Sequence, residues 1–302
     1  MNWKLDSTYI QIIPPKEFDF QECLVFLNRS NQELLHQMKD GHIYKLLKID
    51  ESLILVKLGY ENHMIKVEFP YHQPSEESCR KVAEYVWEWF DLDSDLAGFY
   101  EMAAKDKVLN KMAQQYYGLR ILCIPDLFEA LIWAIIGQQI NLTFAYTLKR
   151  RLIEHFGESL TVNGDTFWLF PSYKKIASID LEDLKKLQFT GRKAEYIIGI
   201  ANSMKNEEIT KESLLLQQDN QKIVKSLTAI RGIGPWSADY VMMKCFHSIT
   251  SFPIGDVGLQ NALKNRLGME RKPTVEEMKK LAENWEGWEA YATFYLWRSL
   301  YE

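Results

Sequence analysis

The stretch SLTAIRGIGPWSADYVMMKCFHSITSFPIGDVGL, residues 226–259, carries most of the information in this chain. Its pattern predicts a helix, a tight hairpin and a second helix, followed by a return loop that ends at an aspartate. Gly232 and Gly234 suit a turn that needs positive φ or close packing, and Pro235 fits the first position of a helix. The hairpin therefore directs free N–H groups, at the positive end of the second helix, toward a docked phosphate.

Asp256 lies 22 residues beyond Gly234, which leaves room for the second helix and a loop that returns to the hairpin. As the last residue before VGLQNALKNRLG, it is typical of an N-cap, which would keep its carboxylate ionised and fix its direction. An ionised carboxylate can stabilise positive charge on a sugar or orient an attacking water. Asp239 is the weaker candidate, because it falls inside the second helix and is expected to pair locally.

This pattern resembles the helix-hairpin-helix (HhH-GPD) DNA glycosylase superfamily, and within it the DNA-3-methyladenine glycosylase II branch. The resemblance rests on the hairpin with FPIGDVGL, on FEALIWAIIGQQINL (128–142) and on WEGWEAYATFYLWRSL (285–300). It implies an enzyme of base excision repair that flips an alkylated purine of the 3-methyladenine type out of double-stranded DNA. Asp256 would then promote hydrolysis of the N-glycosidic bond.

The resemblance also implies an aromatic base pocket. Trp236 and Tyr240 share one face of the second helix, and Trp288 matches a tryptophan of the same pocket. Flat side chains hold an extruded base, and an indole attracts a positively charged, alkylated one. Trp236 stands where strand-nicking members carry a lysine nucleophile, so the sequence predicts a monofunctional enzyme. Lys244 does not match that position and is expected to be structural.

The DNA contacts implied by the resemblance lie in two turns. Gln138 and Gln139 close an apolar helix, and Gln139 matches the wedge that fills the gap left by the extruded base. The hairpin contributes Arg231, Gly232, Ile233, Gly234 and Ser237. No cofactor is expected to be required. Backbone carbonyls of the superfamily hairpin can hold Na⁺ or K⁺, and the matching residues are Thr228, Ile230 and Ile233.

Two other functions fit parts of the pattern. One is an 8-oxoguanine (oxidised-purine) glycosylase in which another residue replaces the missing lysine; its product would be a nicked strand. The other is a non-catalytic helix-hairpin-helix DNA-binding module, which would have no use for Asp256 or for the aromatic face at Trp236 and Tyr240.

Composition limits the class of protein without naming a function. The 302 residues are 47% hydrophobic and 25% charged, as in ordinary globular proteins. Four scattered cysteines predict neither a zinc site nor a disulfide framework, and no apolar run is long enough to span a membrane. We therefore expect a monomer in the cytoplasm. The net charge of −5 predicts modest non-specific DNA affinity, although residues 221–237 contain three basic residues and no acidic one.

The predicted fold class is α+β, with an N-terminal sheet domain (1–100) before an all-helical glycosylase region (101–302). Strands are predicted at 9–13, 53–58, 64–69 and 167–170, and helices at 18–27 and 77–90. In the helical region we expect a central subdomain at 125–246, with the hairpin at 226–246, and a second made of 101–124 and 247–302. Its helices are predicted at 95–118, 126–137, 142–156, 173–179, 181–187, 192–205, 211–217, 220–230, 235–246, 257–267, 274–284 and 287–300.

Overall fold

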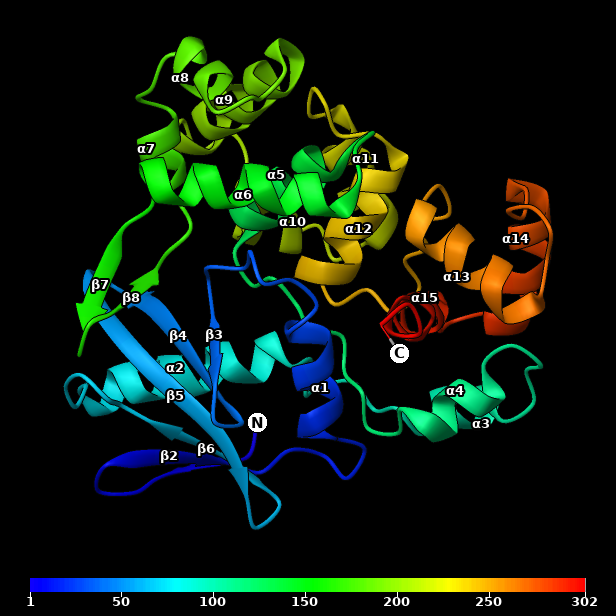
Figure 1. The fold of residues 1–302 in the computed structure, drawn as a ribbon, viewed down its shortest axis with the longest axis horizontal. Helices are drawn as coiled ribbons and strands as arrows, with labels where there is room; N and C mark the ends of the chain where they lie inside the picture. Colours follow the sequence, from blue (N-terminus) through cyan, green and yellow to red (C-terminus); the bar gives the residue numbers. More distant parts are fainter. Residues whose placement is uncertain (302) are drawn as a thin grey trace.

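Alternating apolar residues build the N-terminal part of the chain into an antiparallel sheet. The structure is a computed structural model that describes residues 1–301. Six strands pair in the order β1-β2-β6-β5-β4-β3 (Figure 1). They are β1 (Trp3–Leu5), β2 (Tyr9–Ile12), β3 (Gln37–Lys39), β4 (His42–Ile49), β5 (Ser52–Glu61) and β6 (Met64–Glu68). The predicted strands at 9–13, 53–58 and 64–69 are thus confirmed.

Both faces of this sheet are covered. Ile54, Val56 and Leu58 of β5 face the helices α1 (Phe20–Leu27) and α2 (Glu76–Trp89) in one large core. The alternate residue Leu55 faces the other way and packs with Phe167 of a small hairpin, β7 (Ser159–Val162) and β8 (Asp165–Trp168). The prediction missed β4, because Lys45 and Lys48 interrupt its apolar pattern. Lys45 is nevertheless buried, with Nζ donating to the Leu35 carbonyl at 3.1 Å.

The remainder is helical, as predicted. The described helices are α3 (Ala97–Ala103), α4 (Asn110–Gln115), α5 (Leu127–Gly137), α6 (Leu142–Phe156), α7 (Tyr173–Ile176), α8 (Leu181–Lys186), α9 (Gly191–Lys205), α10 (Lys211–Leu215), α11 (Asn220–Ala229), α12 (Pro235–Cys245), α13 (Val257–Leu267), α14 (Val275–Ala282), the 3-10 turn η1 (Glu283–Trp285) and α15 (Glu289–Arg298). The single helix predicted at 95–118 is wrong. Asp106 breaks it, because its side chain accepts hydrogen bonds from the N–H groups of Val108 and Leu109, each at 2.8 Å.

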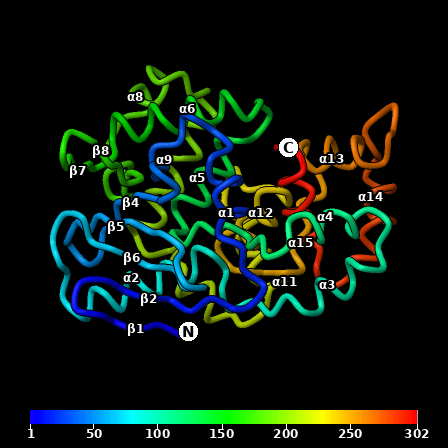
Figure 2. The backbone as a smooth tube through the Cα atoms, turned by 60° about the horizontal axis from the view of Figure 1, so that its bottom comes forward, coloured from blue at the N-terminus to red at the C-terminus, as the bar shows by residue number. Residues whose placement is uncertain are grey.

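Two large apolar cores organise the molecule. One lies within residues 127–245, and the other joins the N-terminal sheet to α3, α4 and α13–α15. The C-terminal helix α15 consequently packs beside α1, with the rings of Phe26 and Phe294 4.3 Å apart (Figure 2). The boundary at residue 100 stays a prediction, and residue 302 of the predicted second domain lies outside the described residues. The loop 246–256 runs between the two cores, and it ends at Asp256.

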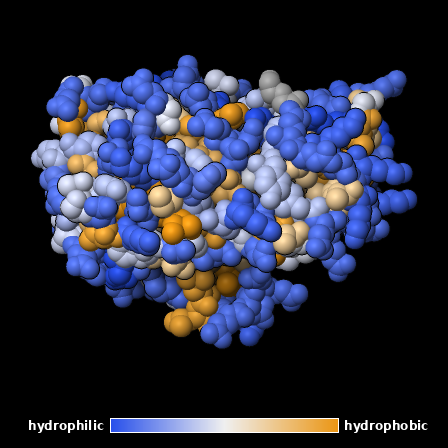
Figure 3. Space-filling view, turned by 90° about the horizontal axis from the view of Figure 1, so that it is seen from below, coloured by the Kyte–Doolittle hydropathy of each residue, from blue (hydrophilic) through white to orange (hydrophobic). Residues whose placement is uncertain are grey.

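The face of the molecule seen from below the view of Figure 1 is mostly hydrophilic, with a small hydrophobic patch at its lower edge (Figure 3). None of the helices described for residues 1–301 combines the length and the apolar character that crossing a membrane demands.

Candidate active site

The hairpin has the geometry that its glycines predict. Helix α11 ends at Ala229, and the turn closes with a 3.0 Å hydrogen bond from the Ile233 N–H to the Ile230 carbonyl. Buried Ile233 anchors the turn, while Arg231 and Gly234 are exposed. Because α12 begins at Pro235, its first-turn N–H groups have no partner within the helix and face outward at its positive end.

The two glycines of the hairpin have different roles. Gly232 has φ +99°, and a Cβ there would meet the Tyr196 ring at 2.5 Å. Gly234 has φ −89°, and a Cβ there would meet nothing within 4 Å. Gly232 is therefore required by the fold itself. Gly234 leaves open space in front of the helix N-terminus, where a phosphate can approach closely.

Asp256 is fixed as the N-cap of α13, as predicted from its position. Its Oδ1 accepts the N–H of Leu259 and the indole N–H of Trp297, both at 2.7 Å. Both bonds fall on Oδ1, which leaves Oδ2 for a water or for developing positive charge. Gly258 permits this arrangement, since a Cβ there would lie 2.9 Å from Oδ1. Burial raises the pKa of Asp256, and these donors, with the nearby indole of Trp236, partly offset the rise.

An aromatic row lies beside this carboxylate. The rings of Trp236 and Tyr240 have centroids 5.8 Å apart, and those of Tyr240 and Trp297 are 6.1 Å apart. Trp236 and Trp297 are half-buried, and the Trp236 Nε1 is buried without a hydrogen bond of normal geometry. The row thus combines flat faces with a spare donor next to the ionisable group, as a pocket for an extruded base requires.

The structure does not bring Trp288 to this row. Trp288 is the N-cap of α15 and packs on α3, with Phe99 at 6.0 Å between ring centroids. A Cβ on Gly98 would meet its ring at 3.1 Å. Trp297, nine residues further along, occupies the place expected for Trp288. The sequence contains no clear signal for this choice, because residues 290–296 of α15 are all buried and Trp297 follows Phe294 at i, i+3 spacing, with ring centroids 6.4 Å apart.

Gln138 and Gln139 lie in different surroundings at the end of α5. The Gln138 amide donates to the Gly232 carbonyl at 2.9 Å and to the Ser237 hydroxyl at 3.0 Å, so it braces the hairpin from behind. Gln139 has φ +56° and is exposed. Sequence reasoning missed Lys193, whose Nζ binds the carbonyls of Ile136 (2.7 Å) and Gln138 (2.8 Å) and so stabilises this turn.

The remaining hairpin residues lie close together. Arg231 projects from the turn and pairs with Glu195 at 2.9 Å, whereas Ser237 is buried behind it. The carbonyls proposed for a cation belong to Thr228, Ile230 and Ile233. They come from one short turn and offer the oxygen ligands that hard cations prefer, so they fit a monovalent ion, which stays a prediction.

Lys244 and Asp239 form no hydrogen bond or ion pair with Asp256. Burial lowers the pKa of Lys244 to about 7, and its ammonium donates to the Leu122 carbonyl over the Phe294 ring. The local pairing expected for Asp239 is wrong: among residues 1–301 nothing forms a hydrogen bond or ion pair with it, and burial raises its pKa to about 6.

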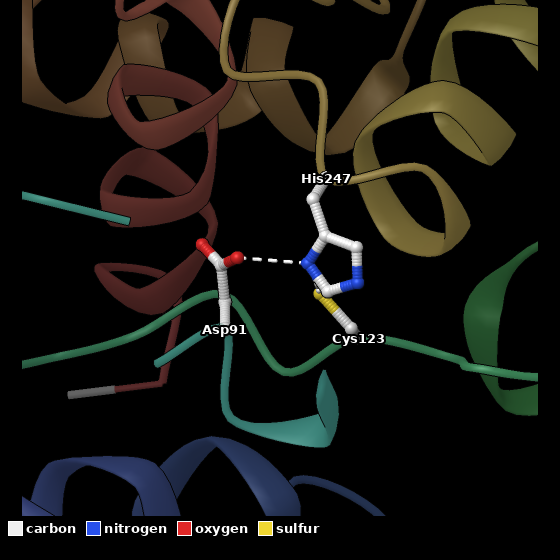
Figure 4. Close-up of side chains that lie close together, drawn as sticks. All are labelled: Asp91, Cys123 and His247. Atoms are coloured by element: carbon white, nitrogen blue, oxygen red, sulfur yellow. Dashed lines mark hydrogen bonds and ion pairs between the residues drawn. The ribbon is translucent and has the colours of Figure 1, made fainter. Parts of the chain in front are cut away.

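One buried cluster fixes the start of the loop that leads to Asp256. His247 Nδ1 donates to Asp91 Oδ1 at 2.8 Å and lies 3.5 Å from the Cys123 sulfur (Figure 4). Although burial lowers it, Cys123, Asp91 and Glu88 raise the pKa of His247 to about 12. These donor types can bind a metal, but the protonated imidazole lacks a free lone pair. Asp91 Oδ2 also accepts the hydroxyls of Tyr291 and Ser94. We therefore assign the cluster a structural role.

With this geometry in place, the class of the protein follows. Residues 132–287 match the model of the HhH-GPD superfamily of base excision DNA repair proteins, and residues 11–131 match that of the 8-oxoguanine DNA glycosylase N-terminal domain. The chain belongs to the HhH-GPD superfamily.

Individual relatives cover all or part of the chain. A DNA-3-methyladenine glycosylase of Bacillus subtilis is 43% identical over the full length of both proteins. DNA-3-methyladenine glycosylase 2 of Escherichia coli is 27% identical over 63% of each chain. Among solved structures, a 3-methyladenine DNA glycosylase from Archaeoglobus fulgidus has a TM-score of 0.82 at 22% identity, covering 95% of this chain and 97% of its own. An 8-oxoguanine glycosylase/lyase of Clostridium acetobutylicum in complex with double-stranded DNA has a TM-score of 0.77 at 18% identity, and the match covers 99% of this chain and 97% of its own. These two show the fold.

Proposed function

We propose that this protein is a monofunctional DNA glycosylase that removes alkylated purines of the 3-methyladenine type in base excision repair. The observation that carries the proposal is the pairing of Asp256, oriented on Oδ1 by Leu259 and Trp297, with the row of Trp236, Tyr240 and Trp297. A carboxylate beside flat rings and next to a phosphate-binding hairpin suits chemistry on an extruded nucleotide. The full-length relative from Bacillus subtilis supports the same substrate class.

The reaction uses the free oxygen of Asp256. As the C1′–N bond of the flipped nucleotide lengthens, positive charge develops on the sugar, and the ionised carboxylate stabilises it. Asp256 also orients the attacking water and takes its proton. A ring-alkylated purine already carries positive charge and departs neutral, so the site needs no general acid. The indole faces attract such a cationic base by about 0.5–2 kcal/mol, which favours damaged over normal bases.

DNA is held by the two turns in front of the pocket. The N-terminal N–H groups of α12, opened by Gly234, bind a backbone phosphate, and Arg231 adds charge beside them. The left-handed, exposed Gln139 enters the duplex and replaces the extruded base. Because these contacts form along one strand and need no symmetry, we propose that a cytoplasmic monomer acts on double-stranded DNA.

The alternatives predict different products. A lyase of the oxidised-purine type needs an amine at the pocket, but Trp236 stands at that position and Lys244 is committed to the Leu122 carbonyl. A purely DNA-binding module would use the hairpin without needing Trp297 to orient Asp256.

The test uses duplex DNA methylated on its purines, incubated with wild type and with Asp256→Asn. Free base and strand breaks without alkali are both measured. We expect the wild type to release methylpurines without breaks. Asp256→Asn is expected to lose on the order of a hundredfold in rate or more, while Asn still caps α13. The matched control is Asp239→Asn, which removes a carboxylate of α12 that forms no hydrogen bond or ion pair with Asp256. We expect this variant to keep its activity. Binding without base release from wild type would refute the proposal, and broken strands would favour the lyase.

A further inference from the structure

Arg29 is a half-buried cation that forms no ion pair with a carboxylate of residues 1–301, although Glu33 lies near enough to act on its charge. It follows α1, and its guanidinium donates through Nη1 to the Phe26 carbonyl at 2.9 Å. Its Cζ lies 4.2 Å from the ring centroid of Phe26 and 5.6 Å from that of Tyr146. A guanidinium has five N–H groups, so one backbone bond leaves most of them unused.

The other buried arginines are occupied differently. Arg120 donates to the carbonyls of Glu17, Asp91 and Ser94, and Arg298 pairs with Glu22 at 2.9 Å. Those two side chains join the sheet domain to the rest of the molecule. Arg29 makes no comparable connection, so its remaining N–H groups are free to bind a ligand.

Arg29 lines a partly enclosed cavity together with Tyr240, the middle ring of the aromatic row. Glu33 and Glu129, which are both paired with Lys149, line the same cavity. Burial raises the pKa of the Tyr240 and Tyr301 hydroxyls. The positive charge of Arg29 opposes this rise and the negative charge of Asp256 adds to it, so both charged groups lie near both tyrosines. A base whose sugar sits at Asp256 therefore extends along these tyrosines toward Arg29.

We propose that Arg29 is a specificity-determining residue that donates hydrogen bonds to the exocyclic oxygen of the extruded base. This inference rests on the proposed glycosylase function and states which of its alkylated purines the pocket favours, namely those with a keto edge. A guanidinium only donates, so it suits the O6 acceptor of a methylated guanine and opposes the amino group of a methylated adenine.

A matched pair of lesions tests this role. Methylated duplex DNA contains both 3-methylguanine and 3-methyladenine, which carry the same methyl position and the same charge but different edges. Both free bases are quantified from one reaction with wild type, Arg29→Met and Arg29→Lys. Any loss of folded protein lowers both bases by the same factor, so the ratio of 3-methylguanine to 3-methyladenine reports only selectivity.

We expect Arg29→Met to lower that ratio about tenfold, the loss typical of one charge-assisted hydrogen bond. Arg29→Lys, which keeps the cation without the planar fork, is expected to fall between the two. An unchanged ratio in both variants would overturn the role of Arg29 even if the total release fell. If the wild type released neither base, the glycosylase function itself would fail, which is a distinct result.

Discussion

The hairpin at residues 226–246 and the junction between the sheet domain and α6 hold their functional atoms in opposite ways. In the hairpin, neighbouring residues present backbone N–H groups at an exposed turn. At the junction, Lys149 of α6 is buried between Glu33 (3.0 Å), 116 residues away, and Glu129 (3.5 Å). Although burial raises it, Lys149 and His36 hold the pKa of Glu33 well below its ordinary value.

This difference shows what each region tolerates. The hairpin depends on backbone conformation, so removing a side-chain charge there costs little and adding a Cβ costs much. The junction depends on paired buried charges, so removing one of those charges costs much stability. The aromatic row takes Trp236 and Tyr240 from α12, and Tyr240 also lines the cavity that Arg29 of the sheet domain borders.

The largest expected effect is at the junction. Lys149→Met leaves two buried carboxylates without a cation, and we expect it to lower the free energy of unfolding by about 3–5 kcal/mol. The control Arg150→Met removes the adjacent exposed pair with Glu154 (2.9 Å), with an expected loss of about 0.2–1 kcal/mol. Urea unfolding monitored by fluorescence measures both. Equal losses would mean that the junction is no more than a surface contact.

Within the hairpin, the two glycines separate folding from binding. Gly232→Ala forces a Cβ into the Tyr196 ring at positive φ, with an expected loss of about 1–3 kcal/mol in unfolding free energy. Gly234→Ala is expected to change stability by less than about 0.5 kcal/mol. It nevertheless weakens DNA binding, because the methyl group occupies the approach to the α12 N–H groups. Thermal unfolding and DNA-binding titrations measure the pair; equal effects on both quantities would contradict this division.

Trp297→Phe tests a contribution from a distant part of the chain, because Trp297 contacts Asp256 across 41 residues. Losing the indole donor to Asp256 Oδ1 raises the pKa of a carboxylate that must be ionised to act. We therefore expect about a tenfold lower kcat/KM near neutral pH, and an acid limb displaced to higher pH. Trp288→Phe, which changes the packing on α3, is the control. A shared pH profile for the two variants would show that Trp297 does not orient Asp256.

The smallest effect concerns Asp239. Burial raises the pKa of Asp239 in the folded protein to about 6, above its ordinary value of 3.8, so the folded state loses stability as pH rises between these values. Asp239→Asn removes this penalty and is expected to stabilise the protein by about 1 kcal/mol at pH 7.5, after allowance for partial exposure, and by nothing near pH 4. Unfolding at the two pH values measures it; an equal gain at both would exclude titration of Asp239 as the cause.

The predictable features were those made by neighbouring residues. The Gly232 turn, the Pro235 helix start and the Asp256 cap follow from backbone preferences that act over a few positions. By contrast, Trp297 and Arg29 have ordinary sequence surroundings. Trp297 contacts Asp256 across 41 residues, and Arg29 approaches Tyr240 only because α1 packs against α15.

The sequence by itself determined the hairpin, the capped carboxylate, the absence of a pocket lysine and the order of a sheet domain before a helical body. Each depends on local conformation or on residue type. Only the tertiary structure decided that Trp297 rather than Trp288 contacts Asp256, that Gln138 supports the hairpin while Gln139 is exposed, and that Arg29 shares a cavity with Tyr240. The reason is that packing of distant helices selects which face of each one meets the site, and helical periodicity alone leaves several faces available.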